Sequence, residues 1–431
     1  MLQQLEESQW WTPDMLRAHQ YGQLTILLRH AMASVPYYAE RLRAAGVPAR
    51  EPLTPEIWQG IPLLRREDIQ EAGTALHSKA VPKGHQPLNR NSTSGSTGKP
   101  VEIIWSRIAQ LFWDVFTLRD HRWHRRDLHR KLAVIRSFPD GKALYPKGAR
   151  SRTWAPIAGS IYATGPSVGL AITTSTEHQA EWLRRQRPEY LLTFPSALGD
   201  LVLHCRDNNI SFPGLREVRT ISEAIDSELR LACREILGVP LTDIYSTQES
   251  GYLALQCPDH EHYHVQGEGV FLEVLDEEER ACGPGETGRI VITPLHNFAM
   301  PLIRYDIGDY AELGGPCPCG RGLPVLKGIL GRVRNMVTLP NGERYWPSLY
   351  GGLFRKIAPI RQYQVVQKSL NHLDVGLVMD RELTDQEKDE LRDLIHTRIR
   401  YPFDLTFSYH DEIPRGPGGK YEDFKSEVTP A

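Results

Sequence analysis

Helix-like and strand-like segments alternate between residues 179 and 245, and this alternation constrains the fold more than any other feature. Apolar residues recur at helical spacing in the longer segments, whereas the shorter apolar runs suit buried strands. In chain order, the expected elements are a helix at 180–187, a strand at 190–193, a helix at 197–208, a strand at 217–220, a helix at 227–237 and a strand at 241–245. Such an order is typical of βαβ units on a largely parallel sheet. The chain is therefore predicted to be an α/β protein.

Other parts of the chain have a different pattern. Residues 13–45 carry helical periodicity that ends near Pro36, and short apolar runs at 101–104 and 132–135 suit buried strands. Two runs, 270–275 and 289–293, flank a Gly-Pro-Gly turn and predict antiparallel strands. With 431 residues, the chain is expected to form two or three domains.

Past Gly331 the pattern indicates a small α+β domain of about 100 residues. A hairpin is expected around Asn341-Gly342, followed by strands at 362–367 and 373–379. A helix is expected to begin near Thr384, with Glu387 completing a capping box. Its apolar positions fall on one face, and they are Leu391, Leu394, Ile395 and Ile399.

The composition excludes several classes of protein. The net charge of −2 provides no basic field for nucleic acid. No apolar run reaches the roughly 18 residues needed to span a bilayer, and the acidic, polar N-terminus resembles neither a signal peptide nor a transit peptide. We therefore expect a cytoplasmic protein without nucleic-acid or membrane partners. In that setting, six cysteines indicate free thiols or a metal site rather than disulfides.

Residues 92–100 read Ser-Thr-Ser-Gly-Ser-Thr-Gly-Lys-Pro, a segment rich in groups that bind phosphate. Its hydroxyl and backbone N–H groups can donate to phosphate oxygens, and its glycines allow close approach. It is not a Walker A loop, because only Ser96 and Thr97 separate Gly95 from Gly98. A flexible Gly/Ser surface turn is the alternative.

Three further motifs carry candidate functional groups. Tyr245 begins Tyr-Ser-Thr-Gln-Glu-Ser-Gly directly after a predicted strand, where an aromatic ring can stack on a base and Glu249 can hold Mg²⁺ beside phosphate. The run Pro-Leu-Ile-Arg-Tyr-Asp-Ile-Gly-Asp ends at Asp309, whose two oxygens suit a ribose diol. Lys420 lies on a Gly/Pro-rich loop near the C-terminus, and a flexible cation there suits charge developing on phosphate. Each motif alone also fits an ordinary turn or tail.

The order of these motifs, with Gly331-Arg332 between the last two, resembles the superfamily of AMP-forming acyl-adenylating ligases. Pro36-Tyr37-Tyr38 and residues 300–309 are most similar to its phenylacetate–CoA ligase branch. The resemblance extends from about residue 20 to residue 425. It implies a large N-terminal domain (1–331) of mixed sheets with flanking helices and a small antiparallel lobe, followed by a small mobile α+β domain (332–431). The C-terminal domain of this superfamily rotates between the two half-reactions.

The resemblance also implies a reaction and a set of site residues. A carboxylate attacks the α-phosphate of Mg·ATP to give acyl-AMP and pyrophosphate, and a thiol, commonly that of CoA, then takes the acyl group. Lys420 and Glu249 are the implied catalytic residues, and Glu249 also binds magnesium. The implied nucleotide-binding residues are Ser94, Gly95, Ser96, Thr97, Gly98 and Lys99 for the β,γ-phosphates, Tyr245, Ser246 and Gln248 beside the adenine and phosphates, and Asp309 and Arg332 at the ribose.

Two departures from the family pattern concern the acceptor. Gln248 stands where a Thr or Ser usually precedes the magnesium-binding Glu, and Asn335 replaces the usual hinge Asp. An amine or a carrier protein is therefore an alternative acceptor to CoA. A catalytically silent, zinc-stabilised binding protein of the same fold is a second alternative.

Cysteines and histidines indicate a structural zinc site in a lobe at about residues 255–325. Cys317-Pro-Cys319 forms a tight thiolate pair, and Cys257 precedes three histidines by a few residues. Cys257, Cys317, Cys319 and His264 are the expected ligands, with His260 and His262 as alternatives to His264. Cys205, Cys233 and Cys282 are expected to be ordinary thiols.

The acyl pocket is implied only by resemblance, between about residues 135 and 225. Its expected lining, which could suit an aromatic or flat acid, comprises Ser137-Phe138, Tyr162-Ala163, Phe194-Pro195-Ser196 and Ser222-Glu223-Ala224. A homodimer is the family-level expectation.

Overall fold

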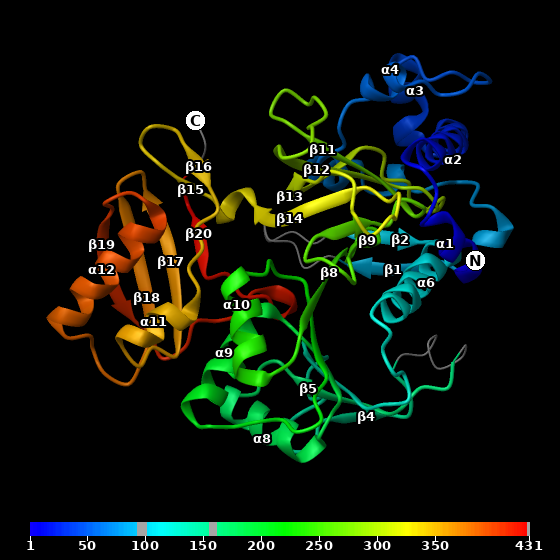
Figure 1. Ribbon diagram of the computed structural model, residues 1–431. Coiled ribbons are helices and arrows are strands. Elements are labelled where there is room, and N and C mark those ends of the chain that lie inside the picture. Colours follow the sequence, from blue (N-terminus) through cyan, green and yellow to red (C-terminus); the bar gives the residue numbers. More distant parts are fainter. Residues whose placement is uncertain (93–100, 155–161, 429–431) are drawn as a thin grey trace. The chain divides into compact units, whose positions relative to one another are not determined.

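The computed structural model describes residues 1–92, 101–154 and 162–428 (Figure 1). Contacts divide the chain into two units. Unit 1 consists mainly of Met1–Asp127 and Ile244–Ile329, and unit 2 mainly of Leu128–Gly159, Ala163–Asp243 and Leu330–Ala431. The predicted domain boundary between residues 331 and 332 stays a prediction.

Unit 1 combines N-terminal helices with antiparallel strands. Its helices are α1 (Leu2–Ser8), α2 (Pro13–Ser34), α3 (Pro36–Ala44), α4 (Pro55–Gln59), α5 (Arg66–Ala72) and α6 (Arg107–Trp123), with the 3-10 turns η1 (Gly73–Leu76) and η2 (Lys83–His85). Its strands are β1 (Asn89–Ser92), β2 (Glu102–Trp105), β8 (Leu241–Thr247), β9 (Gly251–Gln256), β10 (Tyr263–Val265), β11 (Val270–Leu275), β12 (Thr287–Pro294), β13 (Tyr305–Leu313) and β14 (Val325–Arg332).

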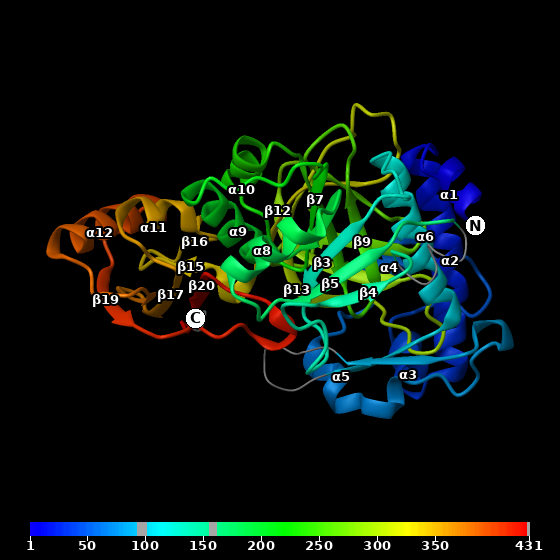
Figure 2. The ribbon, with the colours of Figure 1, turned by 90° about the horizontal axis from the view of Figure 1, so that it is seen from below.

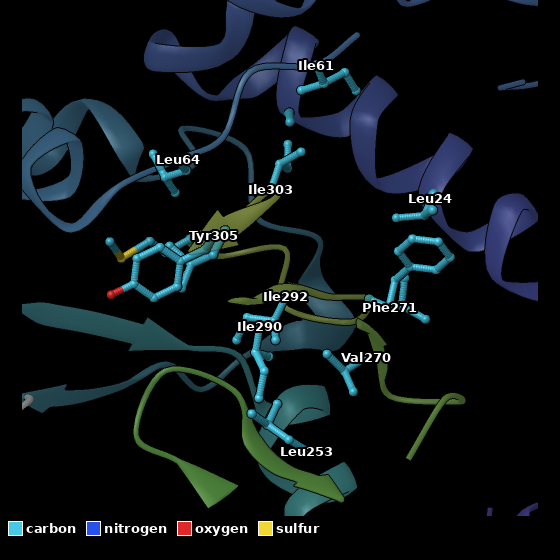
Figure 3. Packing of buried hydrophobic residues seen from close by; sticks show 14 of the residues in the cluster. Leu24, Ile61, Leu64, Leu253, Val270, Phe271, Ile290, Ile292, Ile303 and Tyr305 are labelled. Carbon is cyan, nitrogen blue, oxygen red and sulfur yellow. The ribbon is translucent and has the colours of Figure 1, made fainter. Parts of the chain in front are cut away.

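The main sheet of unit 1 has the strand order β11-β12-β13-β14-β10-β9-β8. β12 pairs antiparallel with β11 and β13, and β10 pairs antiparallel with β14 and β9, as does β8 with β9. The antiparallel strands expected at 270–275 and 289–293 are thereby confirmed. Figure 3 shows the core of this unit, where Phe271, Ile290 and Ile292 of the sheet lie near Leu24 of α2 and Tyr305 of β13.

The helical periodicity of residues 13–45 produces two helices. The Thr12 hydroxyl accepts the Met15 N–H at 3.3 Å, and Pro13 occupies the first turn, where its missing N–H costs nothing. α2 ends before Pro36, which has no N–H to continue the ladder but is well suited to begin α3. Leu24 and Leu28 are fully buried, so α2 packs its apolar face into the core.

Unit 2 contains the predicted parallel sheet. Its helices are α8 (Thr176–Gln186), α9 (Pro195–Asp207), α10 (Ser227–Ala232), α11 (Gly351–Ile357) and α12 (Asp385–Ile399), with shorter turns η3 (Cys233–Leu237), η4 (Val333–Asn335) and η5 (Pro417–Gly419). Its strands are β3 (Leu132–Arg136), β4 (Ala149–Ser151), β5 (Ser167–Ala171), β6 (Tyr190–Thr193), β7 (Glu217–Ile221), β15 (Val337–Thr338), β16 (Arg344–Tyr345), β17 (Gln362–Ser369), β18 (His372–Val378), β19 (Asp404–Tyr409) and β20 (Phe424–Ser426).

The alternation of segments after residue 179 forms βαβ units, as expected. Strands β7, β6, β3 and β5 run parallel in that order, and β4 adds an antiparallel edge. Figure 2 shows α8, α9 and α10 beside this sheet. Buried apolar residues of α8 and α9, such as Trp182 and Leu198, pack against the strands. A parallel sheet needs such helical cover on its faces.

Residues 337–426 of unit 2 have a four-stranded sheet of their own, in the order β19-β18-β17-β20. The capping box at Thr384 and Glu387 is present at the start of α12. Leu391, Ile395 and Ile399 of this helix are fully buried in a separate apolar core. The pairs β18/β19 and β17/β20 are parallel, and neither β19 nor β20 was expected from the sequence.

Among the residues described, no helix combines the length and the apolar character needed to cross a membrane.

Candidate active site

Tyr245 and Asp309, two residues predicted to bind adenosine, lie together in unit 1. The Tyr245 hydroxyl donates a hydrogen bond to Asp309 Oδ2 at 2.8 Å. Tyr245 is buried at the end of β8, whereas Asp309 is half-buried on β13. A carboxylate fixed in this way keeps its second oxygen in a defined orientation, as recognition of a ribose diol would require.

A local irregularity in β13 sets the orientation of Asp309. Gly308 has φ +77°, and its N–H donates to Asp306 Oδ1 at 2.9 Å. The pairing register with β12 shifts at this point, so that β13 carries extra residues between Asp306 and Tyr310. Such a bulge re-aims a side chain, and a glycine at positive φ permits it.

The turn that carries Glu249 is held by two tryptophans. Trp105 Nε1 donates to the Gln248 carbonyl at 3.0 Å, and the Ser250 N–H donates to Thr247 Oγ1 at 3.2 Å. Gly251 has φ +86°, and a Cβ there would lie 2.9 Å from the Trp113 ring. Glu249 is half-buried in this turn, and Ser246 is half-buried at the end of β8. The sequence analysis missed both tryptophans, because their contacts join distant segments.

Six predicted phosphate-binding residues (Ser94, Gly95, Ser96, Thr97, Gly98 and Lys99) lie outside the described residues.

Arg332 and the hinge position Asn335 belong to unit 2. The Arg332 carbonyl accepts the Trp346 Nε1–H at 3.0 Å. Asn335 Nδ2 donates to the Phe424 carbonyl at 2.8 Å and to Glu422 Oε1 at 3.3 Å. An aspartate could make neither bond and would repel Glu422, which explains in physical terms why an amide stands here.

The loop that carries Lys420 lies against residues expected to line the acyl pocket. Gly419 has φ +81°, and a Cβ there would lie 3.0 Å from Ile172, 3.3 Å from Phe194 and 3.4 Å from Ser137. The loop is closed by a bond from the Gly416 N–H to the Lys420 carbonyl at 2.8 Å. Within unit 2, the structure therefore brings the predicted catalytic lysine close to Ser137 and Phe194.

Other residues of the expected acyl pocket have different surroundings. Phe138 packs on β5, where a Cβ on Gly169 would meet its ring at 2.6 Å. Tyr162, in unit 1, is 37% exposed. The acyl pocket as a whole therefore stays a prediction.

A second constellation, the cysteine–histidine cluster, consists of Cys257, His264, Cys317 and Cys319. Their ligand atoms all lie within 4.8 Å of one another. The Cys257 and Cys317 sulfurs are 3.9 Å apart, and Cys319 Sγ lies 3.4 Å from His264 Nε2. A tetrahedral Zn²⁺ with Zn–S bonds of about 2.3 Å places two sulfurs about 3.8 Å apart. The four donors therefore fit the size and chemistry of a structural zinc site.

The other two candidate histidines lie at the edge of the cysteine–histidine cluster. His262 is half-buried, and its Nε2 lies 3.0 Å from Cys317 Sγ. His260 is exposed and stacks on the His262 ring. His264, in contrast, is fully buried in β10. The geometry thus favours His264, in line with the sequence analysis.

Electrostatics favour the metal-binding forms of two of these groups. Burial, followed by the positive charges of His262 and Arg321, lowers the pKa of His264 to about 3, so its ring is neutral. Burial opposes ionisation of Cys319, but backbone and side-chain hydrogen bonds from Arg321 and one from Cys317 bring its pKa below the usual value. Burial raises the pKa of Cys317 to about 12.

The loop of residues 317–322, called the cysteine loop below, also contacts the N-terminal segment. The Gly322 N–H donates to the Gln9 carbonyl at 3.0 Å, and a Cβ on Gly322 would lie 1.7 Å from the Trp11 carbonyl oxygen. The Arg321 guanidinium lies over the Trp10 ring at 4.9 Å and over the Trp123 ring at 4.6 Å. Residues 9–11 and the cysteine loop therefore fold as one piece.

Comparisons with known proteins place this fold. The CapK C-terminal domain family matches residues 349–427. The phenylacetate–coenzyme A ligase of Thermus thermophilus is 26% identical over 376 residues, with 84% of this chain and 80% of that protein covered. The enzyme of the same name from Escherichia coli is 24% identical over 426 residues, with 94% and 93% covered.

A solved structure covers almost the whole chain. It is the structure of 2-hydroxyisobutyryl-CoA ligase in the postadenylation state with 2-HIB-AMP bound, which superposes with a TM-score of 0.73 at 18% identity. It covers 95% of this chain and 89% of its own. The fold is therefore that of the AMP-forming acyl-adenylating enzymes. The named relatives are acid–thiol ligases of the phenylacetate–CoA ligase branch, and this similarity confirms the resemblance found in the sequence.

Proposed function

We propose that this protein uses ATP to join a carboxylic acid to the thiol of CoA through an acyl-adenylate. In the first step a carboxylate oxygen attacks the α-phosphorus of ATP, and the bond to the β-phosphate breaks to release pyrophosphate. In the second step the thiolate attacks the acyl carbonyl, and AMP leaves. The Tyr245–Asp309 hydrogen bond carries the proposal, because it joins two predicted adenosine-binding residues that are 64 positions apart.

Each predicted site residue has a role in this scheme. The Asp309 carboxylate accepts hydrogen bonds from the ribose hydroxyls, and the Tyr245 ring lies beside the adenine. Glu249 would hold Mg²⁺, which would neutralise phosphate charge, and the segment 94–99 together with Arg332 would support the nucleotide. Lys420 stabilises charge at the α-phosphate as the acyl-adenylate forms. An aromatic acid is the proposed substrate class, since the named relatives are phenylacetate–CoA ligases. A cytoplasmic location and a homodimer stay predictions.

Exchange of labelled pyrophosphate into ATP, measured across a panel of aryl and short aliphatic acids, tests the proposal. Acid-dependent exchange is expected with at least one aromatic acid. If folded protein that binds ATP shows no exchange with any acid, the proposal is contradicted and a catalytically silent binding protein is favoured. The names of the relatives, which are ligases, do not support that alternative. Adding CoA to the active acid and finding no thioester would favour an amine or carrier-protein acceptor.

Replacing Asp309 by asparagine is expected to raise the KM for ATP by about 10-fold or more, because a charge-assisted bond to the ribose is worth about 1.5–3 kcal/mol. Tyr245→Phe removes only the hydroxyl that orients Asp309, so a smaller rise is expected. Both KM values come from the exchange assay. An equal KM for the Asp309→Asn variant and the unaltered protein would remove Asp309 from the ATP site.

We further propose that Cys257, His264, Cys317 and Cys319 hold one structural Zn²⁺. The support is the set of distances within the cysteine–histidine cluster. Zinc there would join the β9–β10 hairpin to the cysteine loop, and it would take no part in the reaction.

Elemental analysis of the protein, purified without chelator, is expected to find about one zinc per chain. Cys319→Ser is expected to lose the metal and to speed proteolysis within residues 1–12, which the cysteine loop holds. Cys282→Ser is the matched control, because Cys282 is a buried thiol of the same unit outside the cluster. Zinc well below one per chain in the unaltered protein would refute the site.

A further inference from the structure

Glu223 is a largely buried carboxylate whose two oxygens are both used by backbone N–H groups. Its side chain is 9% exposed and follows β7. One oxygen accepts the Ser196 N–H at 2.9 Å, and the other accepts the Tyr421 N–H at 2.8 Å. Tyr421 directly follows Lys420 in the chain, and 198 positions separate it from Glu223.

The hydrogen bond from the Ser196 N–H explains how the Glu223 carboxylate is stabilised in a largely buried position. Ser196 lies in the first turn of α9, whose N-cap residue, Phe194, offers no side-chain cap. Glu223 supplies that cap from another segment, and a negative charge is favoured at a helix N-terminus. Burial raises the pKa of Glu223, while its two backbone N–H partners and Arg415 act in the opposite direction. The position of Glu223 is therefore fixed by the sheet and by α9.

Arg415 binds the other side of the loop of residues 416–421 that carries Lys420, called the lysine loop below. Its Nη1 donates to Ser196 Oγ at 2.8 Å and to the Gly419 carbonyl at 3.2 Å, and it lies 3.9 Å from Glu223 Oε1. The residues on both sides of Lys420 are thus bound, Gly419 by Arg415 and Tyr421 by Glu223. These contacts give the backbone of Lys420 a defined position.

We propose that Glu223 is the positioning residue of Lys420, and that it fixes the lysine loop for acyl-adenylate formation, with Arg415 as its partner. The inference rests on the proposed function. The geometry differs from the expectation that Glu223 lines the acyl pocket, because both carboxylate oxygens face backbone N–H groups. Because Lys420 acts only in acyl-adenylate formation, the contacts of Glu223 and Arg415 are expected to matter in that half-reaction and not in thioester formation.

The test separates the two half-reactions in the full-length protein. Glu223→Ala is expected to slow acid-dependent pyrophosphate exchange by about 100-fold with little change in the KM for ATP, because a misplacement of about 1 Å has effects of this size. Thioester formation from synthetic acyl-adenylate and CoA is expected to change less than about threefold. Glu223→Gln keeps one acceptor oxygen and nearly the same volume, so partial rescue of exchange is expected.

Glu228→Ala provides the matched control. Glu228 Oε1 accepts a bond from Arg398 Nη2 at 2.6 Å, so this variant breaks another contact between residues 163–243 and residues 330–431. It leaves the lysine loop untouched, and exchange within about threefold of the unaltered protein is expected. Equal losses in the Glu223→Ala and Glu228→Ala variants, or equal losses in both half-reactions, would overturn the positioning role.

A measurement without catalysis tests the anchor itself. Hydrogen–deuterium exchange in peptides covering residues 416–423 is expected to be faster in Glu223→Ala and Glu223→Gln, whereas peptides from α12 stay unchanged. Unchanged exchange in residues 416–423 would overturn the proposal. If the unaltered protein showed no pyrophosphate exchange with any acid, the proposed function would fail, and deuterium uptake would still decide whether Glu223 holds the loop.

Discussion

Lys420→Ala is expected to abolish acid-dependent pyrophosphate exchange while ATP binding changes little. In the proposed mechanism the ammonium group acts on charge that develops in the transition state, so its loss would raise the barrier more than it weakens ground-state binding. Removal of one such preorganised donor slows catalysis by about 10²–10³-fold in other enzymes, and the loss of a full charge is expected to be at least as severe. Pyrophosphate exchange and equilibrium binding of ATP, measured on the same preparation, check the two halves of this prediction.

Lys425→Ala is the matched control for that experiment. Lys425 lies on β20, five residues beyond Lys420, and its replacement removes the same charge from the same segment. Exchange close to that of the unaltered protein is expected. If Lys420→Ala reduced ATP binding and exchange equally, Lys420 would be a structural residue. Glu223 would then have no catalytic lysine to position.

Arg304→Ala is expected to lower the free energy of unfolding by about 3–5 kcal/mol, since removing one partner of a buried ion pair leaves a buried charge uncompensated. Arg304 is 1% exposed, with φ +50°. Its Nη1 donates to the Gln59 carbonyl at 2.8 Å and to the Ile61 carbonyl at 2.6 Å, and its Nη2 lies 3.3 Å from Glu273 Oε1. Urea denaturation followed by tryptophan fluorescence measures the change.

The deficit of the Arg304→Ala variant is expected to depend on pH. Burial raises the pKa of Glu273, and Arg304 is the strongest influence that opposes the rise. Without Arg304 the pKa of Glu273 rises further, so the folded state binds a proton that the unfolded state releases. Stability is then retained below the unfolded pKa of Glu273 and lost as the pH rises through the folded one. A deficit that is the same at pH 5 and pH 8 would contradict this account.

Arg280→Met is the control for the Arg304 experiment. Arg280 forms an exposed pair with Asp276 in the same unit, and its loss is expected to have little effect on the urea midpoint.

Local signals explain which elements could be predicted from the sequence. The order β6–α9–β7 and the capping box at Thr384 depend on neighbours within one turn or one strand, and both are present. Strand β19 was missed although Leu405, Phe407 and Tyr409 alternate with polar residues, because so short an alternation is a weak signal without its partner strand β18. Strand β20 is only three residues long and is defined by its partner β17.

In the candidate site too, features set by neighbouring residues could be predicted, whereas those set by distant segments could not. Cys-Pro-Cys and the Cys/His spacing predict a metal site from sequence, and Cys257, His264, Cys317 and Cys319 do lie together in the structure. The role of Glu223 could not be seen in this way, since its partner N–H groups belong to Ser196 and Tyr421. Sequence order indicates which motifs occur together, but it does not identify the buried side chains that hold them in place.

The contact between Gly322 and the Trp11 carbonyl has a consequence for engineering of the chain. A shortened version beginning at α2 would lose Gln9, whose Oε1 accepts a hydrogen bond from Trp123 Nε1 at 2.7 Å. It would also lose Trp10, which covers one face of the Arg321 guanidinium. Residues 9–11 thus cover one side of the cysteine loop. Purification tags and truncations at this end therefore act on the cysteine loop, more than 300 residues away in the chain.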